Sequence, residues 1–586
     1  MQQEWFEMPE IRRRRLDKAV WVPLRASQTL QTVGKRGFVG FREEFFGAGS
    51  VAVPLDKRAS AETLGWCDIG LRQGHAGGVD EGRYVPADVY DGWNLQLSAI
   101  ALALAQDGNS EDPPEWHLHQ DFVITLRLKR EGDVWLAPDE DYIEVARLKR
   151  EQGVPALLEV RAEHLKDYLC ARSMALYVSS YRLREEVVDQ PSSIDWPTSP
   201  YEQISGADRW EGRKAEIHEG GEFLGASWAV MHITRENIDF AEDVPKIGPF
   251  DENLTTRSWT TKERGKKLLR IQGEFWRNEW IEPSTSSPRV RRDKLPSSSF
   301  FVVDVAGNRV NADKLEGTGG WLWFRPDLIV QLARHRGASL RWYTRDTGGI
   351  RCSAATSHVH FGLNRVGLVN VFAKDIGYEP AWAQAIWAGF NVGPDGGVSE
   401  ELLAAQAGGE PADTVAPEEY LPKVLVALNE VSGRKFGFEL FRKHDRLQAL
   451  LKEMHRFRST DQPGLFALAK DLARLTADSI DAAAIQTIVK PAKGEKWGSL
   501  RSLQELVALM EGSTRARSLV GPLFGIYELR LADAHLPSSD IEASLALAKV
   551  NPKAPFVFQG FQLLCSCVSS LQSVGRALSR PMSKVP

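Results

Sequence analysis

The stretch "NVGPDGGVSEELLAAQAGGEPADTVAPEE", residues 391 to 419, separates two parts of the sequence that have different patterns. It is rich in Gly, Ala and Pro, and we place a domain boundary between about residues 400 and 418. Before it, segments alternate with the period of two typical of strands, and beyond Glu419 almost every segment has helical spacing. The sequence therefore predicts an α+β multidomain protein, with a mixed α/β region followed by an all-helical bundle.

Six helices are expected in the bundle. Their apolar spacing and their boundary signals predict residues 418–431, 436–456, 463–476, 498–511, 514–535 and 555–580. Gly521 and Pro522 are expected to kink or split the fifth of them.

The first part of the chain shows strand-like segments such as "DFVITLRLKREGDVWLAP" and "SHVHFGLNRVGLVNVFA". Two stretches rich in Pro, Ser and Thr, 189–200 and 282–299, have the composition of loops or linkers. We therefore expect an α/β module over residues 1–188, a middle segment over 201–281 and a second α/β module over 300–400.

An internal repeat links the two modules. "LEVRAEHLKDYLCARSMAL" (158–176) matches "LWFRPDLIVQLARHRGASL" (322–340) at a constant offset of 164, so that Arg161 corresponds to Arg325. Each copy predicts a strand, a helix and a second strand, which indicates two tandem copies of a small module. The copies fit a recognition or sensing region, and equally a duplication that builds only a scaffold.

Composition indicates an ordinary globular protein. With 43% hydrophobic and 26% charged residues in 586, two to four domains are expected. The N-terminus has no secretory signal, and the longest strongly apolar run, "LSAIALALA", is about half the length that a bilayer requires. Five cysteines, odd in number, favour reduced thiols. We expect a cytoplasmic protein without a membrane segment.

Charge is unevenly distributed. Residues 418 to 586 hold 23 Lys and Arg against 17 Asp and Glu, a net charge of +6, so the first 417 residues carry −11 of the chain's net −5. The helical part is thus the expected nucleic-acid face. The run Arg12 to Arg15 could also contact phosphates, although terminal basic clusters are usually solvated.

Two H-x-H pairs are candidate metal ligands. His117 with His119, and His358 with His360, would each present two imidazoles on one face of a strand. Asp121 could complete the first pair, but half-exposed strands often carry such histidines without a metal. We predict no metal and no cofactor.

The strongest candidate site is "YELRLADAHLP", residues 527 to 537, in which four residues separate Arg530 from His535. This spacing is no evidence by itself, since about three Arg–His pairs with four to six residues between them are expected by chance and the chain contains three. The position of this pair in the expected helix makes it a stronger candidate than the other two pairs. Arg530 continues an apolar stripe through Leu523 and Ile526, where an inward guanidinium needs an anionic partner, and Pro537 should end the helix.

An R-x4-H pattern at the end of a long helix, late in an all-helical domain, resembles the HEPN superfamily over residues 418–586. Many members are metal-independent endoribonucleases of bacterial toxins, abortive-infection systems and CRISPR effectors. The resemblance implies that His535 moves a proton and Arg530 binds the scissile phosphate while the RNA's own 2′-hydroxyl attacks. It also implies a homodimer through the helical domain.

Two functions remain open. The leading hypothesis is an endoribonuclease effector in antiviral (anti-phage) defence, whose N-terminal region senses a phage-derived or cellular trigger. The alternative is a non-catalytic RNA-binding or dimerisation protein with ligand-sensing modules. It is favoured by Leu531, which stands where a polar residue usually follows the arginine in the superfamily.

Overall fold

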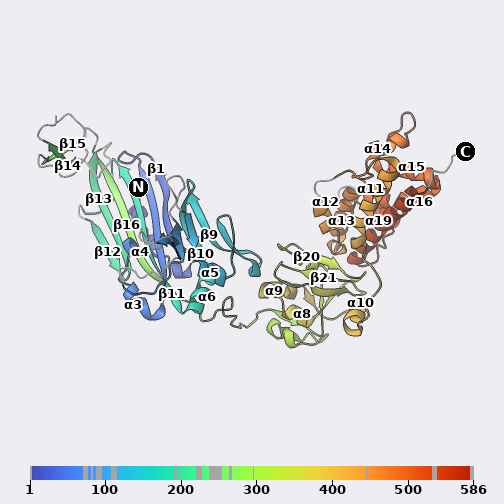
Figure 1. Cartoon of the computed structure of the whole chain (residues 1–586), viewed down its shortest axis with the longest axis horizontal. Helices are drawn as coiled ribbons and strands as arrows, with labels where there is room; N and C mark the ends of the chain where they lie inside the picture. Colours follow the sequence, from blue (N-terminus) through green and yellow to red (C-terminus); the bar gives the residue numbers. More distant parts are fainter. Residues whose placement is uncertain are drawn as a thin grey trace. The chain divides into compact units, whose positions relative to one another are not determined.

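Figure 1 shows a computed structural model of the 586-residue chain. The structure describes residues 3–69, 77–80, 83–86, 95–106, 115–190, 194–197, 200–218, 227–235, 254–262, 267–294, 296–443, 447–530 and 538–580. The chain forms two compact units, one of Met1–Pro138 with Tyr142–Leu295 and one of Asp139–Asp141 with Pro296–Pro586. The boundary that we expected between about 400 and 418 therefore falls inside the second unit.

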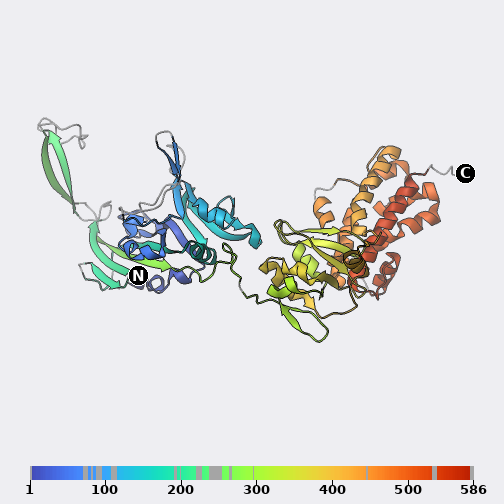
Figure 2. The ribbon, with the colours of Figure 1, turned by 60° about the horizontal axis from the view of Figure 1, so that its bottom comes forward.

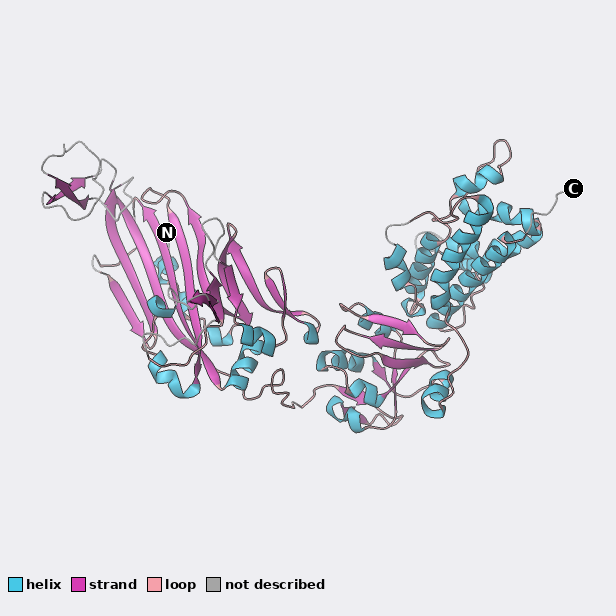
Figure 3. Cartoon of the chain, in the orientation of Figure 1, coloured by secondary structure: helices cyan, strands magenta, loops and turns pink. Residues whose placement is uncertain are grey.

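The first unit is built on a ten-stranded sheet in the order β12-β13-β16-β11-β2-β1-β10-β9-β8-β7 (Figure 3). Every neighbouring pair is antiparallel. Its strands are β1 (Trp21–Val33), β2 (Arg42–Pro54), β7 (Lys129–Glu131), β8 (Val134–Ala137), β9 (Ile143–Glu151), β10 (Val154–Arg161), β11 (Met174–Val188), β12 (Tyr201–Ser205), β13 (Asp208–His218) and β16 (Lys267–Ile281). Three two-stranded pairs accompany it: β3 (Gly77–Asp80) with β4 (Arg83–Pro86), β5 (Ala103–Gln106) with β6 (Glu115–Leu118), and β14 (Ser227–Arg235) with β15 (Leu254–Lys262).

The middle segment is part of this sheet. Residues 201–281, which we expected to stand apart from 1–188, supply β12, β13 and β16. Strand β16 pairs with β11 from Leu176 to Val188. Without β16, one edge of β11 would expose a long row of unpaired backbone groups, so the segment completes the hydrogen bonding of the sheet.

Short helices cover the sheet, and α6 (Ala162–Arg172) contributes most to the core. Its Leu165, Tyr168 and Leu169 are buried with Leu158 of β10 and Val178 of β11 in one hydrophobic cluster. The other α-helices of this unit are α1 (Gln3–Glu7), α2 (Pro9–Arg12), α3 (Arg58–Ala61), α4 (Trp66–Ile69) and α5 (Gln120–Thr125).

The second unit contains a smaller antiparallel sheet, in the order β20-β21-β22-β23-β19-β24. Its strands are β19 (Trp321–Phe324), β20 (Ser339–Trp342), β21 (Thr347–Arg351), β22 (Val359–Leu363), β23 (Val369–Phe372) and β24 (Asn391–Val392). A short pair, β17 (Phe300–Val302) with β18 (Arg309–Asn311), precedes it, and its helices are α7 (Asp327–Ala333), α8 (Ala373–Gly377), α9 (Ala381–Phe390) and α10 (Glu400–Leu403).

The similarity between the two repeat copies is limited to their local secondary structure. Both copies form a strand, a helix and a strand, β10-α6-β11 and β19-α7-β20. In the larger sheet, β2 and β1 lie between β11 and β10. Because each of the three neighbouring pairs is antiparallel, β10 and β11 run antiparallel to each other. In the smaller sheet, β21, β22 and β23 lie between β20 and β19. The four antiparallel pairings in this row make β19 and β20 parallel to each other. The two copies therefore lie in sheets of different topology, and they are not two copies of one module.

The helical region of the second unit contains α11 (Pro417–Phe436), α12 (Leu447–Glu453), α13 (Gln462–Leu475), α14 (Ala482–Ile488), α15 (Ser499–Glu511), α16 (Ser513–Leu529), α18 (Ser538–Leu547) and α19 (Phe556–Leu578). They share one large hydrophobic core. Figure 2 shows the smaller sheet beside these helices, and Phe457 and Val557 of the helical region belong to the core of that sheet. This shared core explains why both parts form one unit.

Four of the six expected helices correspond closely to α11, α13, α15 and α19. The expectation for 436–456 was wrong, because α11 ends at Phe436, where Gly437 follows in a left-handed conformation (φ 81°), and α12 covers only Leu447–Glu453. Helix α16 continues through Pro522 without a break, and α14 and α18 were not expected. No helix of the described residues is both long enough and apolar enough to cross a membrane.

Candidate functional site

Arg530 directly follows the last residue of α16. Leu523 and Ile526 on the same stripe are buried, as the spacing predicted, and the Arg530 side chain is 30% exposed. Its Nη1 donates to both carboxylate oxygens of Asp478, and its guanidinium lies 5.1 Å from the ring centroid of Tyr527. Asp478 is thus the anionic partner that an inward-facing arginine requires.

Asp478 is itself held in place after the end of α13. Its backbone N–H donates to Ala473, and its carbonyl accepts from Nη2 of Arg442 at 2.6 Å. This partner could not be predicted from the sequence, because 52 positions separate Asp478 from Arg530.

The ion pair with Asp478 uses only one nitrogen of the Arg530 guanidinium. Both bonds to Asp478 come from Nη1, and no described residue accepts a hydrogen bond from Nε or Nη2 of Arg530. The edge formed by Nε and Nη2 can donate two parallel hydrogen bonds to the oxygens of a phosphate or a carboxylate.

The second predicted residue, His535, lies outside the described residues, as does Leu531. Glu528, a possible supporting side chain, accepts a hydrogen bond from Ser544 of α18 at 3.2 Å. The described residues therefore establish the contacts of Arg530 with Asp478 and Tyr527.

The H-x-H pairs are occupied by contacts within the protein. His117 lies 3.1 Å from Arg130, and Nδ1 of His119 accepts from the backbone N–H of Asp121 at the start of α5. Burial lowers the pKa of both imidazoles. The carboxylate of Asp121 is paired with Arg172, so it is not a free third ligand.

The histidines of the second H-x-H pair also contact other residues of the protein. His358 lies within hydrogen-bonding distance of Ser339, and His360 contacts the ring of Tyr343 edge-on. Among the described residues, no group of three or more His, Cys, Asp or Glu side chains could hold a metal ion.

The basic run near the N-terminus contacts the β12–β13 hairpin. Arg12 donates to Gln203 at 2.7 Å and lies over the ring of Trp210, and Arg15 forms an ion pair with Asp208. Two of its four arginines thus have partners within the first unit.

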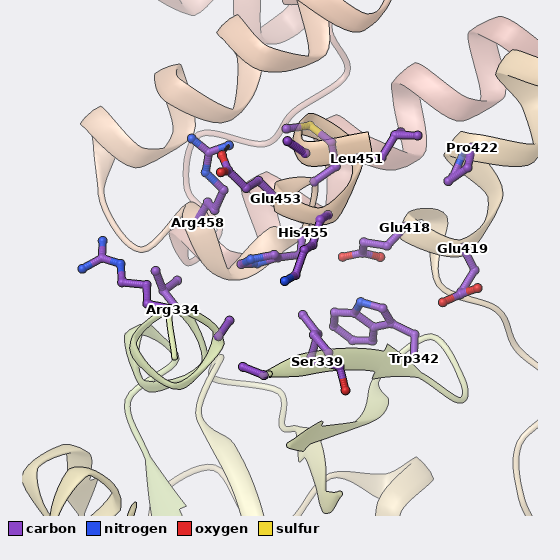
Figure 4. A pocket seen from close by; sticks show the side chains of 17 residues that line it. Arg334, Ser339, Trp342, Glu418, Glu419, Pro422, Leu451, Glu453, His455 and Arg458 are labelled. Carbon is purple, nitrogen blue, oxygen red and sulfur yellow. Dashed lines mark ion pairs between the residues drawn. The ribbon is translucent and has the colours of Figure 1, made fainter. Parts of the chain in front are cut away.

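A cavity of about 700 Å³ lies between the smaller sheet and the helical region of the second unit (Figure 4). Much of its wall is apolar, with Val330 of α7, Leu340 of β20, Pro422 of α11, and Leu451 and Met454 from the segment around α12. His455 and Trp342 also line it. Sequence periodicity could not reveal it, because its wall combines residues from distant segments.

His455 is the buried polar group of this cavity. Its side chain is 7% exposed, and burial lowers its pKa to about 4, so the imidazole is neutral at pH 7. Its Nδ1 is buried and has no hydrogen-bond partner among the residues that the structure describes. Because a buried N–H without an acceptor is costlier than a bare acceptor nitrogen, we assign the proton to Nε2.

No protein-family model, curated protein or solved structure matches the chain at a significant level.

Proposed function

We propose that the helical region cleaves RNA at Arg530 and His535 without a metal ion, and that the sheets preceding it regulate this activity in antiviral (anti-phage) defence. The observation that best supports the proposal is the state of Arg530. Its Nη1 is held by Asp478, and its Nε and Nη2 have no acceptor among the described residues. Such an arginine is oriented and still able to bind a phosphate.

Arg530 would bind the scissile phosphate and offset the negative charge that develops as the neighbouring 2′-hydroxyl attacks. His535 would move the proton, since an unperturbed imidazole has a pKa of about 6.5 and exchanges protons readily near neutral pH. Asp478 would act as a positioning residue, because it restricts the guanidinium to one direction. A homodimer through the helical region would bring two such sites to one cleft.

A non-catalytic RNA-binding or dimerisation protein is the second candidate. The carboxylate of Asp478 beside Arg530 favours it, because this negative charge partly cancels the attraction of the guanidinium for a phosphate. Such a protein would bind RNA through the net charge of the helical region and leave it intact.

The test is incubation of the purified full-length chain with end-labelled single-stranded RNA in EDTA. We expect cleavage by the wild-type protein, and a loss of at least about 100-fold in Arg530→Ala and in His535→Ala. Arg517→Ala is the matched control, since Arg517 is an exposed arginine of the same helix α16. RNA that is shifted in a gel but never shortened supports the second candidate, and equal cleavage by all four proteins rejects this site.

A further inference from the structure

The smaller sheet of the second unit turns one of its faces toward the hydrophobic core. Leu340, Ile350 and Val359 lie opposite one another on β20, β21 and β22, and all three pack in that core. Because side chains alternate along a strand, the residues on either side of these three point to the other face. We call it the open face, and at this end of the sheet it carries Ser339, Arg341, Gly349, Arg351, His358 and His360.

An exposed aromatic ring lies on the open face. Tyr343, which directly follows β20, is 48% exposed, and its ring contacts that of His360 edge-on with the centroids 5.3 Å apart. A Cβ at Gly349 would lie 2.5 Å from the hydroxyl oxygen of Tyr343. The tyrosine therefore extends across Gly349, whose missing side chain leaves room for it.

Two more aromatic side chains continue the open face on β23 and β19. Leu322 and Val371 are paired and buried in the core, so their paired neighbours Trp321 and Phe372 point to the open face. Both rings are partly exposed, and their centroids lie 5.4 Å apart. At about 4.8 Å between strands, the row from β20 to β19 spans about 19 Å.

The arginines of the open face lack counter-charges. Arg341 is exposed and Arg351 partly exposed, and neither side chain forms an ion pair or a hydrogen bond with a described residue. Burial lowers the pKa of His358, and the positive charges of Arg341 and Arg351 lower it further. One carboxyl group, that of Asp375 on α8, lies close enough to interact with His360, and burial raises its pKa. Two arginines against one carboxyl group leave the face positive.

We propose that the open face binds a single-stranded nucleic acid, with a base stacked on Tyr343 and backbone phosphates on Arg341 and Arg351. An arginine can hold a phosphate through two parallel hydrogen bonds, and aromatic rings on a sheet stack the unpaired bases of a single strand. A row of exposed side chains favours an extended strand over a small molecule, which is usually enclosed in a cavity. The proposal does not depend on RNA cleavage at Arg530.

The probes are labelled oligouridylates of about 12 nucleotides with a 2′-O-methyl group on every sugar, and oligothymidylates of the same length. Neither probe has a 2′-hydroxyl, so binding to the full-length protein can be measured by fluorescence anisotropy whether or not the protein cleaves RNA. Both should bind, and the tighter of the two identifies whether the strand is RNA or DNA. This test can therefore fail while cleavage at Arg530 succeeds, and the reverse.

Salt dependence should separate the stacking residue from the phosphate-binding residues. Tyr343→Leu should weaken binding by about tenfold without changing the slope of log affinity against log salt concentration, and Tyr343→Phe, which keeps the ring, should bind like the wild type. Arg341→Gln and Arg351→Gln should each weaken binding by about fivefold. Each should also reduce that slope by about 0.7, because each removes one phosphate contact.

Arg334→Gln is the control for loss of a positive charge. Arg334 is exposed and lines the cavity with Leu340, on the buried side of the sheet, so its variant should change neither the affinity nor the slope. Circular dichroism establishes that each variant is folded. The proposal is overturned if neither probe binds, if Tyr343→Leu binds as tightly as the wild type, or if both Arg341→Gln and Arg351→Gln keep the wild-type slope.

Discussion

Arg456 is fully buried, and its Nε and Nη2 donate to the two carboxylate oxygens of Glu418 at 2.8 and 2.9 Å. The rings of Trp342 and Phe561 lie 4.2 and 4.3 Å from its guanidinium. Trp342 belongs to β20, Glu418 to α11 and Phe561 to α19. This one arginine therefore joins the smaller sheet to the helical region.

Glu418→Gln should destabilise the second unit by about 3 kcal/mol, because it leaves the buried guanidinium of Arg456 without its closest counter-charge. Urea unfolding followed by tryptophan fluorescence measures the change. Glu419→Gln, at the adjacent exposed position, should stay within about 0.5 kcal/mol of the wild type. Equal effects of the two variants would show that the pair has no such role.

Two glycines of α16 should respond in opposite directions to substitution by alanine. A Cβ at Gly525 would lie 2.5 Å from the backbone nitrogen of Ala548, so Gly525→Ala must push α18 away and should destabilise the helical region by about 1–3 kcal/mol. A Cβ at Gly521 meets only Leu547, at 3.5 Å. Gly521→Ala should therefore stabilise it by up to about 1 kcal/mol. Thermal melting of both variants tests this packing, and a stable Gly525→Ala protein would contradict it.

Glu379 should make the protein less stable as the pH rises from 4.5 to 6. It is 8% exposed, and burial raises its pKa from 4.5 to about 6, although the Cys352 thiol donates a hydrogen bond to it. Between these pH values the folded state keeps a proton that the unfolded state has lost. The free energy of unfolding should fall by about 2 kcal/mol over this range. Glu379→Gln should abolish that fall in urea titrations, and an unchanged pH profile would contradict the assignment.

His455 should make the protein less stable as the pH falls, over a pH range that overlaps the range of Glu379. Its folded-state pKa is about 4 and its ordinary value is 6.5, so between these values the unfolded state binds a proton that the folded state does not. Stability from this residue is complete above pH 6.5 and should fall by about 3 kcal/mol as the pH decreases through 4. His455→Phe should remove this acid sensitivity. The two effects partly cancel in the wild type, so each must be measured in its own variant.

The sequence predicted the α+β layout and the positions of four helices, because those helices carry clear apolar stripes bounded by polar loops. It could not predict that 201–281 completes the larger sheet, since strand pairing depends on contacts between residues far apart in the chain. Strands β11 and β16 illustrate this, with Leu176 paired to Ile281. The prediction of two tandem copies of one module was wrong for a related reason. A strand, helix and strand of similar sequence do not determine the strand order of the sheet that contains them.

At the candidate site, the sequence predicted that Arg530 faces inward and needs an anionic partner. This prediction depends only on the apolar stripe that Arg530 continues on α16. It could not identify Asp478, which reaches Arg530 only through the folding of α13 against α16. The cavity beside His455 was missed altogether, because its wall draws on four short segments and none of them has a recognisable motif.

In the proposed mechanism, the RNA's own 2′-hydroxyl attacks the phosphate held by Arg530, and His535 moves the proton. Mass spectrometry of the RNA ends produced in EDTA tests this mechanism. We expect fragments with 2′,3′-cyclic phosphate and 5′-hydroxyl ends from the wild-type protein, and none from His535→Ala. Intact RNA, or fragments with 3′-hydroxyl and 5′-phosphate ends, would contradict the mechanism.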